Sequence, residues 1–182
     1  MEKMQDEKIL EWFRLDEEKA FRKLFDCYYM PLCIYAVQMT DSFELSEDLV
    51  QDVLLRFWEK KIYQSVTTSL RNYLYIAVRN EVLQYFRHEQ QFATEQLDNL
   101  SLDIPEQDYA EDTLQERYQQ LQQALATLTP QEYQAVKTVV LEKMKYKEAA
   151  TRLGISVNTL KTYLARALKR MRGQGTLLLL LY

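Results

Sequence analysis

The stretch that decides the fold lies near the carboxyl end of the chain and reads KEAATRLGISVNTLKTYLARALKRMR, residues 147–172. The small Ala150 allows two helices to approach closely, and four residues later Gly154 can supply a left-handed turn between them. Ser156 is placed to cap the second helix. The apolar residues of the seam would be Leu153, Ile155, Val157, Leu160, Leu164 and Leu168. The spacing therefore predicts a helix-turn-helix over residues 146–172.

The opposite side of the second predicted helix is polar and basic. It carries Asn158, Lys161, Thr162, Arg166, Lys169 and Arg170. Such side chains can hold phosphates or read base edges in the major groove of DNA. Residues 141–172 hold nine Lys and Arg against two Glu, a local balance of +7, although the whole chain has a net charge of -4. A helical hairpin with a solvated basic face is the alternative, and the Ala-Gly spacing favours DNA binding.

The composition of the 182 residues predicts an all-α protein. Only 3 Gly and 3 Pro accompany a hydrophobic content of 47%, so the turn residues that sheets need are scarce. His88 is the only histidine, and neither a Gly-rich phosphate loop nor paired cysteine spacing is present. We therefore expect no enzymatic activity, no cofactor and no metal site. The amino-terminal segment has no signal-peptide or membrane-span pattern, which favours a cytoplasmic location.

An acidic segment separates two predicted helical domains. From Glu89 to Glu116 there are nine Asp and Glu and no Lys or Arg, with apolar residues too sparse for a packed face. The expected organisation is a helical domain over 1–88, an acidic flexible linker over 89–112, a helix-turn-helix domain over 113–172 and a hydrophobic tail over 173–182. Five leucines in that tail are too few to span a bilayer.

Capping residues and apolar spacing place the helices within each domain. Asp16 can cap a first helix that Pro31 bends or restarts, and Ser46 can cap a second that leaves Glu47, Asp48, Gln51, Asp52 and Arg56 toward solvent. A polar loop over 60–68 and a helix opened by Ser69 follow. In the second domain, a helix over 113–128 precedes Thr129-Pro130-Gln131-Glu132, a capping box with proline at the first helical position.

Two stretches resemble conserved regions of bacterial sigma factors. SEDLVQDVLLRFWEK (46–60), followed by a loop and LRNYLYIAVRNEVLQYFR (70–87), is similar to their second region. The stretch LTPQEYQAVKTVVLEKMKYKEAATRLGISVNTLKTYLARALKRMR (128–172) resembles their fourth region. Without a third domain between them, the order and length are similar to the extracytoplasmic-function (ECF) class, and the resemblance covers about residues 16–172.

The resemblance implies a promoter-specificity subunit of RNA polymerase without a catalytic centre, and it implies roles for particular residues. The helix over 46–60 would dock on the clamp helices of the large polymerase subunit through Asp48, Gln51 and Asp52. The loop 61–68 would form a pocket for an unstacked base of the minus 10 element. The helix after it would contact that element through residues off the apolar seam: Arg71, Asn72, Tyr75, Arg79 and Asn80. We rank Asn80 and Arg79 above Tyr75, because tyrosines belong more often to a core than to a stacking surface.

The fourth-region resemblance implies binding to the minus 35 element, and binding to the polymerase flap. The residues involved would be Ser156, Asn158, Thr159, Lys161, Thr162, Arg166 and Lys169. Tyr163 stands where family members often carry a basic residue, so this position is expected to pack or stack instead of meeting phosphate. The family also implies an anti-sigma factor as a partner, frequently in the inner membrane. The acidic linker would mimic a polyanion in polymerase channels or act as a solubilising tether.

Two other functions compete with this interpretation. A dimeric repressor would bind operators unaided and would need a dimer interface in the first domain. A helical adaptor would bind another protein only, and its basic carboxyl end would be incidental. A stable complex with core RNA polymerase that starts transcription at a specific promoter would exclude both.

Overall fold

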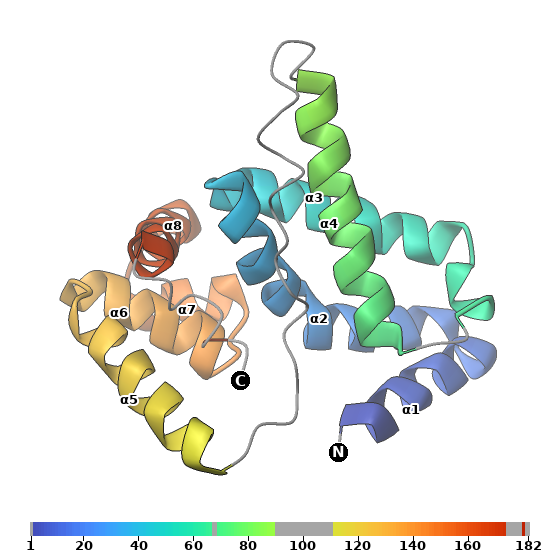
Figure 1. Ribbon diagram of the computed structural model, residues 1–182, viewed down its shortest axis with the longest axis horizontal. Helices are drawn as coiled ribbons and strands as arrows, with labels where there is room; N and C mark the ends of the chain where they lie inside the picture. The colour runs from blue at the N-terminus through green and yellow to red at the C-terminus, as the bar shows by residue number, and fades with distance from the viewer. Residues whose placement is uncertain (1, 67–68, 90–110, 174–179, 181–182) are drawn as a thin grey trace. The chain divides into compact units, whose positions relative to one another are not determined.

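The computed structural model describes residues 2–66, 69–89, 111–173 and 180, and all its regular structure is helical (Figure 1). The elements are α1 (Glu2–Leu15), α2 (Glu17–Thr40), α3 (Phe43–Glu59), the 3-10 turn η1 (Ile62–Gln64), α4 (Leu70–Glu89), α5 (Glu111–Ala126), α6 (Pro130–Val136), the π-helical turn η2 (Lys137–Leu141), α7 (Tyr146–Leu153) and α8 (Val157–Gly173). The all-α prediction is confirmed. Most of the predicted acidic linker and of the hydrophobic tail lies outside the described residues.

The chain forms two compact units: the first contains α1, α2, α4 and α3 from Leu45 onward, and the second contains α5 to α8 and Asp41–Glu44. In the first unit α1 packs against α2, α4 and η1, and α2 packs against α4. Aromatic rings tie the helices together: Phe13 of α1 stacks on Tyr63 of η1, and Phe21 of α2 stacks on Trp58 of α3. Phe13 and Tyr63 are buried and Phe21 and Trp58 are half-buried, and the apolar surface that such rings remove from water stabilises a small helical domain.

The structure corrects two predictions about α2 and α3. The helix α2 does not restart at Pro31, because residues 32–37 are buried on all sides and their packing outweighs the roughly 3 kcal/mol that an internal proline costs. The helix α3 begins at Phe43, so Ser46 lies inside it and its hydroxyl is 2.7 Å from that of Thr40. Ser46 is therefore a buried hydrogen-bonding residue and not the cap of this helix.

Glu47 was predicted to face solvent, and that prediction is wrong. Its side chain is only 3% exposed, and one carboxylate oxygen accepts a 2.7 Å hydrogen bond from the Tyr29 hydroxyl of α2. The apolar spacing of α3 placed Glu47 next to the solvent side, but the tyrosine across the helix pair provides a partner for a buried carboxylate. The pair therefore contributes to the packing of α3 on α2.

The second unit is organised by caps that the sequence displays. Thr129 accepts a hydrogen bond from the backbone of Glu132, and the Glu132 carboxylate accepts one from the backbone of Thr129, so the predicted capping box is confirmed. Gly154 adopts φ 66° between α7 and α8, as predicted for the turn. The core of α8 consists of fully buried Leu160, Leu164, Ala167, Leu168 and Met171. These features form a helix-turn-helix with α7 first and α8 second.

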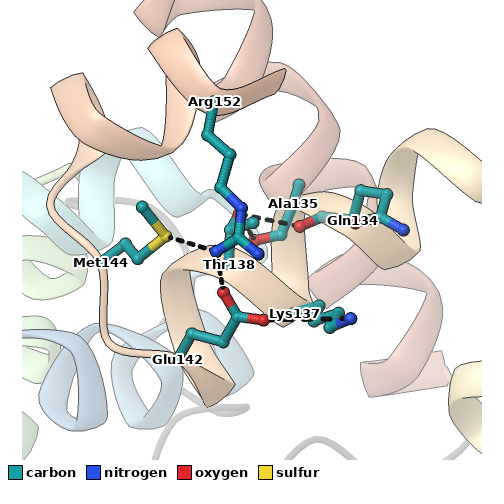
Figure 2. Close-up of polar contacts among 7 residues, drawn as sticks. All are labelled: Gln134, Ala135, Lys137, Thr138, Glu142, Met144 and Arg152. Atoms are coloured by element: carbon teal, nitrogen blue, oxygen red, sulfur yellow. Dashed lines mark hydrogen bonds and ion pairs between the residues drawn. The ribbon is translucent and has the colours of Figure 1, made fainter.

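The turn between α6 and α7 is fixed by polar contacts around a π-helical segment (Figure 2). The Thr138 hydroxyl donates to the carbonyl oxygens of Gln134 and Ala135. At the end of the segment, the Glu142 carboxylate accepts a 2.5 Å hydrogen bond from Arg152 of α7 and lies 3.9 Å from the Lys137 ammonium. Because the Glu142–Arg152 pair bridges the turn, it restrains where α7 begins relative to α6.

Candidate nucleic-acid interface

The exposed side of α8 presents a row of polar side chains on a buried scaffold. Asn158, Thr162 and Arg166 are exposed at intervals of four residues, with exposed Lys169 one turn further on. The Thr162 hydroxyl donates to the Asn158 carbonyl oxygen at 2.9 Å, which fixes its rotamer and leaves its oxygen able to accept. This arrangement offers an amide, a hydroxyl and two cations along one line, the chemistry that reads bases and holds phosphates.

Ser156 and Thr159 act together at the start of α8. The Ser156 Oγ accepts a 3.0 Å hydrogen bond from the Thr159 backbone N–H and lies 2.8 Å from the Thr159 hydroxyl. Ser156 is therefore the predicted N-cap of α8. The two hydroxyls remain at the positive end of the helix, where a phosphate is favoured.

Lys161 makes a contact that the sequence did not reveal. Its ammonium lies 5.1 Å from the centroid of the Tyr146 ring, at the first position of α7. A lysine over an aromatic face is held by the ring quadrupole, a contact worth about 0.5–1 kcal/mol at an exposed site. The two residues belong to different helices and share no helical periodicity, so only the fold brings their side chains together.

Arg170, which the sequence places on the polar side of this helix, is exposed and also has a partner in the same unit. Its guanidinium lies 3.4 Å from the Glu132 carboxylate, the buried acid of the capping box on α6. The pair ties the last part of α8 to the start of α6 within the same unit. Tyr163 is half-buried, and the expectation that it packs or stacks instead of meeting phosphate stays a prediction.

On α4 the structure divides the five predicted residues into two groups. Asn72 and Asn80 are exposed and Arg79 is half-buried. Arg71 and Tyr75 were predicted to lie off the apolar seam, and this is wrong: they are 9% and 1% exposed, with the Arg71 guanidinium 5.1 Å from the Tyr75 ring centroid. The Tyr75 ring also meets Tyr35 of α2 edge to face. The helix α4 packs against both α1 and α2. More of its circumference is therefore buried than its apolar residues alone indicate.

An exposed apolar residue completes the solvent face of α4. Ile76 is 49% exposed and lies four residues from both Asn72 and Asn80. Sequence reasoning missed it because an isoleucine in a helix is ordinarily assigned to the core. An apolar side chain between two amides is suited to contact an unstacked base, since every base presents an apolar face.

The loop before α4 is less polar and more structured than predicted. Tyr63 is buried in η1 and stacks on Phe13 with ring centroids 4.2 Å apart. Lys61 adopts a left-handed backbone with φ 52°, and its ammonium donates a 3.1 Å hydrogen bond to the Glu17 carboxylate. That ammonium is the main reason why the pKa of Glu17 lies below its usual value. Residues 67 and 68 of this predicted pocket lie outside the described residues.

The exposed face of α3 is acidic and polar, as predicted. Asp48, Gln51 and Asp52 are all exposed, and Leu55, one turn beyond Gln51, is an exposed apolar residue that sequence reasoning missed. The Gln51 side-chain amide donates to the Tyr29 hydroxyl at 3.2 Å. Burial, with Cys33 and Glu47 nearby, raises the pKa of Tyr29, so its hydroxyl stays protonated and donates to Glu47.

The described residues show neither of two other kinds of site. Within 2–66, 69–89, 111–173 and 180, no group of three or more His, Cys, Asp or Glu side chains is arranged to hold a metal ion. Over the same residues, no helix is both long and apolar enough to cross a membrane.

These observations define a helical protein with a helix-turn-helix whose second helix carries an exposed row of amide, hydroxyl and cationic side chains. Comparison with protein families gives the sharper result: residues 24–92 match the model of Sigma-70 region 2 and residues 118–171 match that of Sigma-70, region 4. Together the matches take in about two thirds of the chain. The chain belongs to the sigma-70 family, the subunits that bind core RNA polymerase and direct it to promoters. The family consists of non-enzymatic initiation factors.

The two matched regions follow each other with 25 residues between them, too few for another domain of similar size. This is the arrangement predicted for the ECF class, and the prediction is confirmed. Among solved structures, the chain is similar to the sigma factor RpoE from Bartonella quintana, solved in complex with the anti-sigma factor NepR. The sequences are 24% identical, the match covers 85% of this chain and 96% of that chain, and the TM-score is 0.36. No curated protein matches the chain.

Proposed function

We propose that promoter recognition is divided among three exposed helix faces of this chain. The observation that supports this proposal is that the three faces differ in chemistry. The α3 face presents acids and an amide, and the α4 face presents amides beside an arginine. The α8 face presents an amide, hydroxyls and cations. An acidic face repels DNA and suits a protein partner, whereas cationic and amide faces suit nucleic acid. Binding to polymerase and binding to DNA are thereby assigned to different helices.

The α3 face would bind the clamp helices of the large polymerase subunit. Asp48, Gln51 and Asp52 would supply hydrogen bonds and charge pairs, and the exposed Leu55 would supply apolar contact area. Interfaces commonly combine an apolar centre with a polar rim of this kind. The Gln51 amide donates a hydrogen bond to the Tyr29 hydroxyl, which in turn donates to Glu47. These two hydrogen bonds would orient the Gln51 side chain before the polymerase binds.

The α4 face would contact the minus 10 element as it opens. Asn72 and Asn80 would form hydrogen bonds with an unstacked base, Ile76 would contact its apolar face, and Arg79 would hold the backbone. Arg71 and Tyr75, which are buried, would pack behind this surface and would not contact the DNA themselves. The role assigned to them thereby shifts from direct contact to support.

The α8 face would anchor the minus 35 element in the major groove. Asn158 and Thr162 would face base edges, while Ser156, Thr159, Lys161, Arg166 and Lys169 would hold phosphates along the row. The polymerase flap would contact the same domain elsewhere. The protein would act in the cytoplasm with RNA polymerase, and an anti-sigma factor would restrain it there, a class of partner that is bound to RpoE in its solved complex with NepR.

The test is transcription by core polymerase supplied with this chain on a library of templates randomised at the minus 35 and minus 10 positions. We expect a stable complex and enrichment of one pair of sequence blocks at fixed spacing. Asp52→Lys should weaken polymerase binding about tenfold, whereas the control Asp26→Lys, a charge reversal at an exposed residue of α2, should not. Failure to form the complex, or tight promoter binding without polymerase, would overturn the proposal.

A further inference from the structure

The helix α1 lies before the region that matches the sigma family model, yet it contacts the proposed minus 10 surface. The match begins at residue 24, whereas α1 covers Glu2–Leu15. Besides α2, the helix contacts α4 and η1, the two elements on either side of the loop that leads into α4 (Figure 1). The residues that make these contacts indicate what α1 does.

Asp6 of α1 holds the start of α4. Its side chain is buried, and its Oδ2 accepts a 3.2 Å hydrogen bond from the backbone N–H of Arg71, the second residue of α4. Its Oδ1 accepts a hydrogen bond from the Tyr28 hydroxyl of α2. The first N–H groups of a helix have no partner within it, so a carboxylate there satisfies a donor and complements the helix dipole. This cap comes from 65 positions earlier in the chain, whereas the local residue Ser69 accepts a longer 3.4 Å hydrogen bond from Asn72.

Phe13 of α1 holds η1, the turn that precedes α4 in the chain. Its ring stacks on buried Tyr63 with an interplanar angle of 12°, and it meets Phe57 of α3 edge to face. Glu17, the first residue of α2, pairs with Lys61, which has a left-handed backbone and directly precedes η1. The helix α1 therefore contacts both η1, through Phe13, and the first turn of α4, through Asp6.

We propose that α1 is a positioning element for promoter melting, in which Asp6 holds the first turn of α4 and Phe13 holds η1, so that the exposed face of α4 is set to receive the unstacked base. This proposal rests on the assignment of α4 to the minus 10 element. Asn72 follows the capped residue Arg71 directly, so the backbone that carries the Asn72 side chain lies in the helical turn that Asp6 holds. The clamp-facing residues of α3 lie outside this set of contacts. Loss of Asp6 should accordingly impair opening of the DNA and spare binding to polymerase.

The test uses the full chain with core polymerase on a promoter obtained from the randomised library. Opening is followed by the permanganate reactivity of thymines in the minus 10 element, and polymerase affinity is measured separately. Loss of a helix cap costs about 1 kcal/mol, so Asp6→Ala should reduce opening of duplex promoter roughly five- to tenfold. On a template whose minus 10 bases are mismatched, and so already open, the variant should regain most of its activity. Glu7→Ala, at the neighbouring exposed residue of α1, is the matched control and should behave as the parent.

Two further variants keep the outcome decisive. Asp6→Asn retains one acceptor oxygen and should lie between the parent and Asp6→Ala. Phe13→Leu should reproduce the melting defect through loss of the contact with η1. Unchanged opening with Asp6→Ala would overturn the proposal, as would an equal loss of polymerase binding and of activity on the mismatched template. If Asn80→Ala also leaves opening unchanged, the assignment of α4 itself fails. If only Asn80→Ala impairs opening, the role of α1 alone is refuted.

Discussion

Arg56 of α3 donates two hydrogen bonds, each 2.8 Å long, to the two carboxylate oxygens of Glu81 on α4. This two-pronged pair joins the helix proposed to bind polymerase to the helix proposed to open DNA. Hydrogen bonds from Arg56 to Glu81 are the main reason why the pKa of Arg56 is raised. Because the guanidinium and the carboxylate meet in fork geometry, the pair restrains the angle between the two helices as well as their distance.

The first prediction is that Arg56→Gln lowers the free energy of unfolding of the first unit by about 1 kcal/mol. This value lies at the upper end of the range for partly exposed ion pairs, because the geometry of this pair is good. Denaturant unfolding followed by tryptophan fluorescence measures this, because Trp12 and Trp58 are the two tryptophans of the chain and both lie in that unit. A double-mutant cycle with Glu81→Gln should give a coupling of similar size, and additive effects would contradict the inferred restraint.

The second prediction concerns Tyr146 and Lys161. Tyr146→Leu removes the ring beneath the ammonium and should weaken holoenzyme binding to a minus 35 duplex two- to fivefold, since the cation–π contact is worth about 0.5–1 kcal/mol. Tyr146→Phe keeps the ring face and should bind as the parent does. Tyr118→Leu, at an exposed tyrosine of α5, serves as the control. Equal affinity of the leucine and phenylalanine variants in a competition assay would show that the ring does not orient Lys161.

The third prediction separates two arginines of α8. Arg166 is exposed on the DNA-reading row, whereas Arg170 pairs with Glu132. Arg166→Ala should weaken minus 35 binding and reduce the slope of log affinity against log salt concentration by up to about 1, the value for one lost phosphate contact. Arg170→Ala should leave that slope unchanged and lower the thermal stability of the second unit instead. A salt slope that changes equally in both variants would refute the assignment of Arg170 to the scaffold.

The sequence predicted local features of the fold more reliably than features that depend on distant partners. The capping box at Thr129 and the turn at Gly154 are set by residues within one helical turn, so their patterns are visible in the chain itself. Glu47 and Tyr75 were assigned to solvent because they lie beside the apolar arc of a single helix. Their burial depends on Tyr29 and Tyr35 of α2, which only the packed structure brings opposite them.

The candidate site shows the same division. The exposed row of α8 follows from a period of 3.6 residues on a helix with one strongly apolar side, and all its members were predicted. The cap that Asp6 supplies to α4 and the ring that Tyr146 supplies to Lys161 join residues with no periodic relation in sequence. Ile76 and Leu55 were missed for the opposite reason, because an apolar residue on an exposed face resembles a core residue until its surroundings are known.

The last prediction tests the turn on which the helix-turn-helix depends. Gly154 has φ 66°, and a Cβ built on it would meet no atom within 4 Å, so the cost of Gly154→Ala comes from the left-handed backbone alone. That cost is about 1–2 kcal/mol for an L-residue and smaller for asparagine, which tolerates this conformation better. Thermal unfolding followed by far-ultraviolet circular dichroism should therefore rank the second unit in the order glycine, asparagine, alanine. If the alanine variant were as stable as the parent, the turn would have another conformation available, and α8 would not be held in one orientation for the minus 35 element.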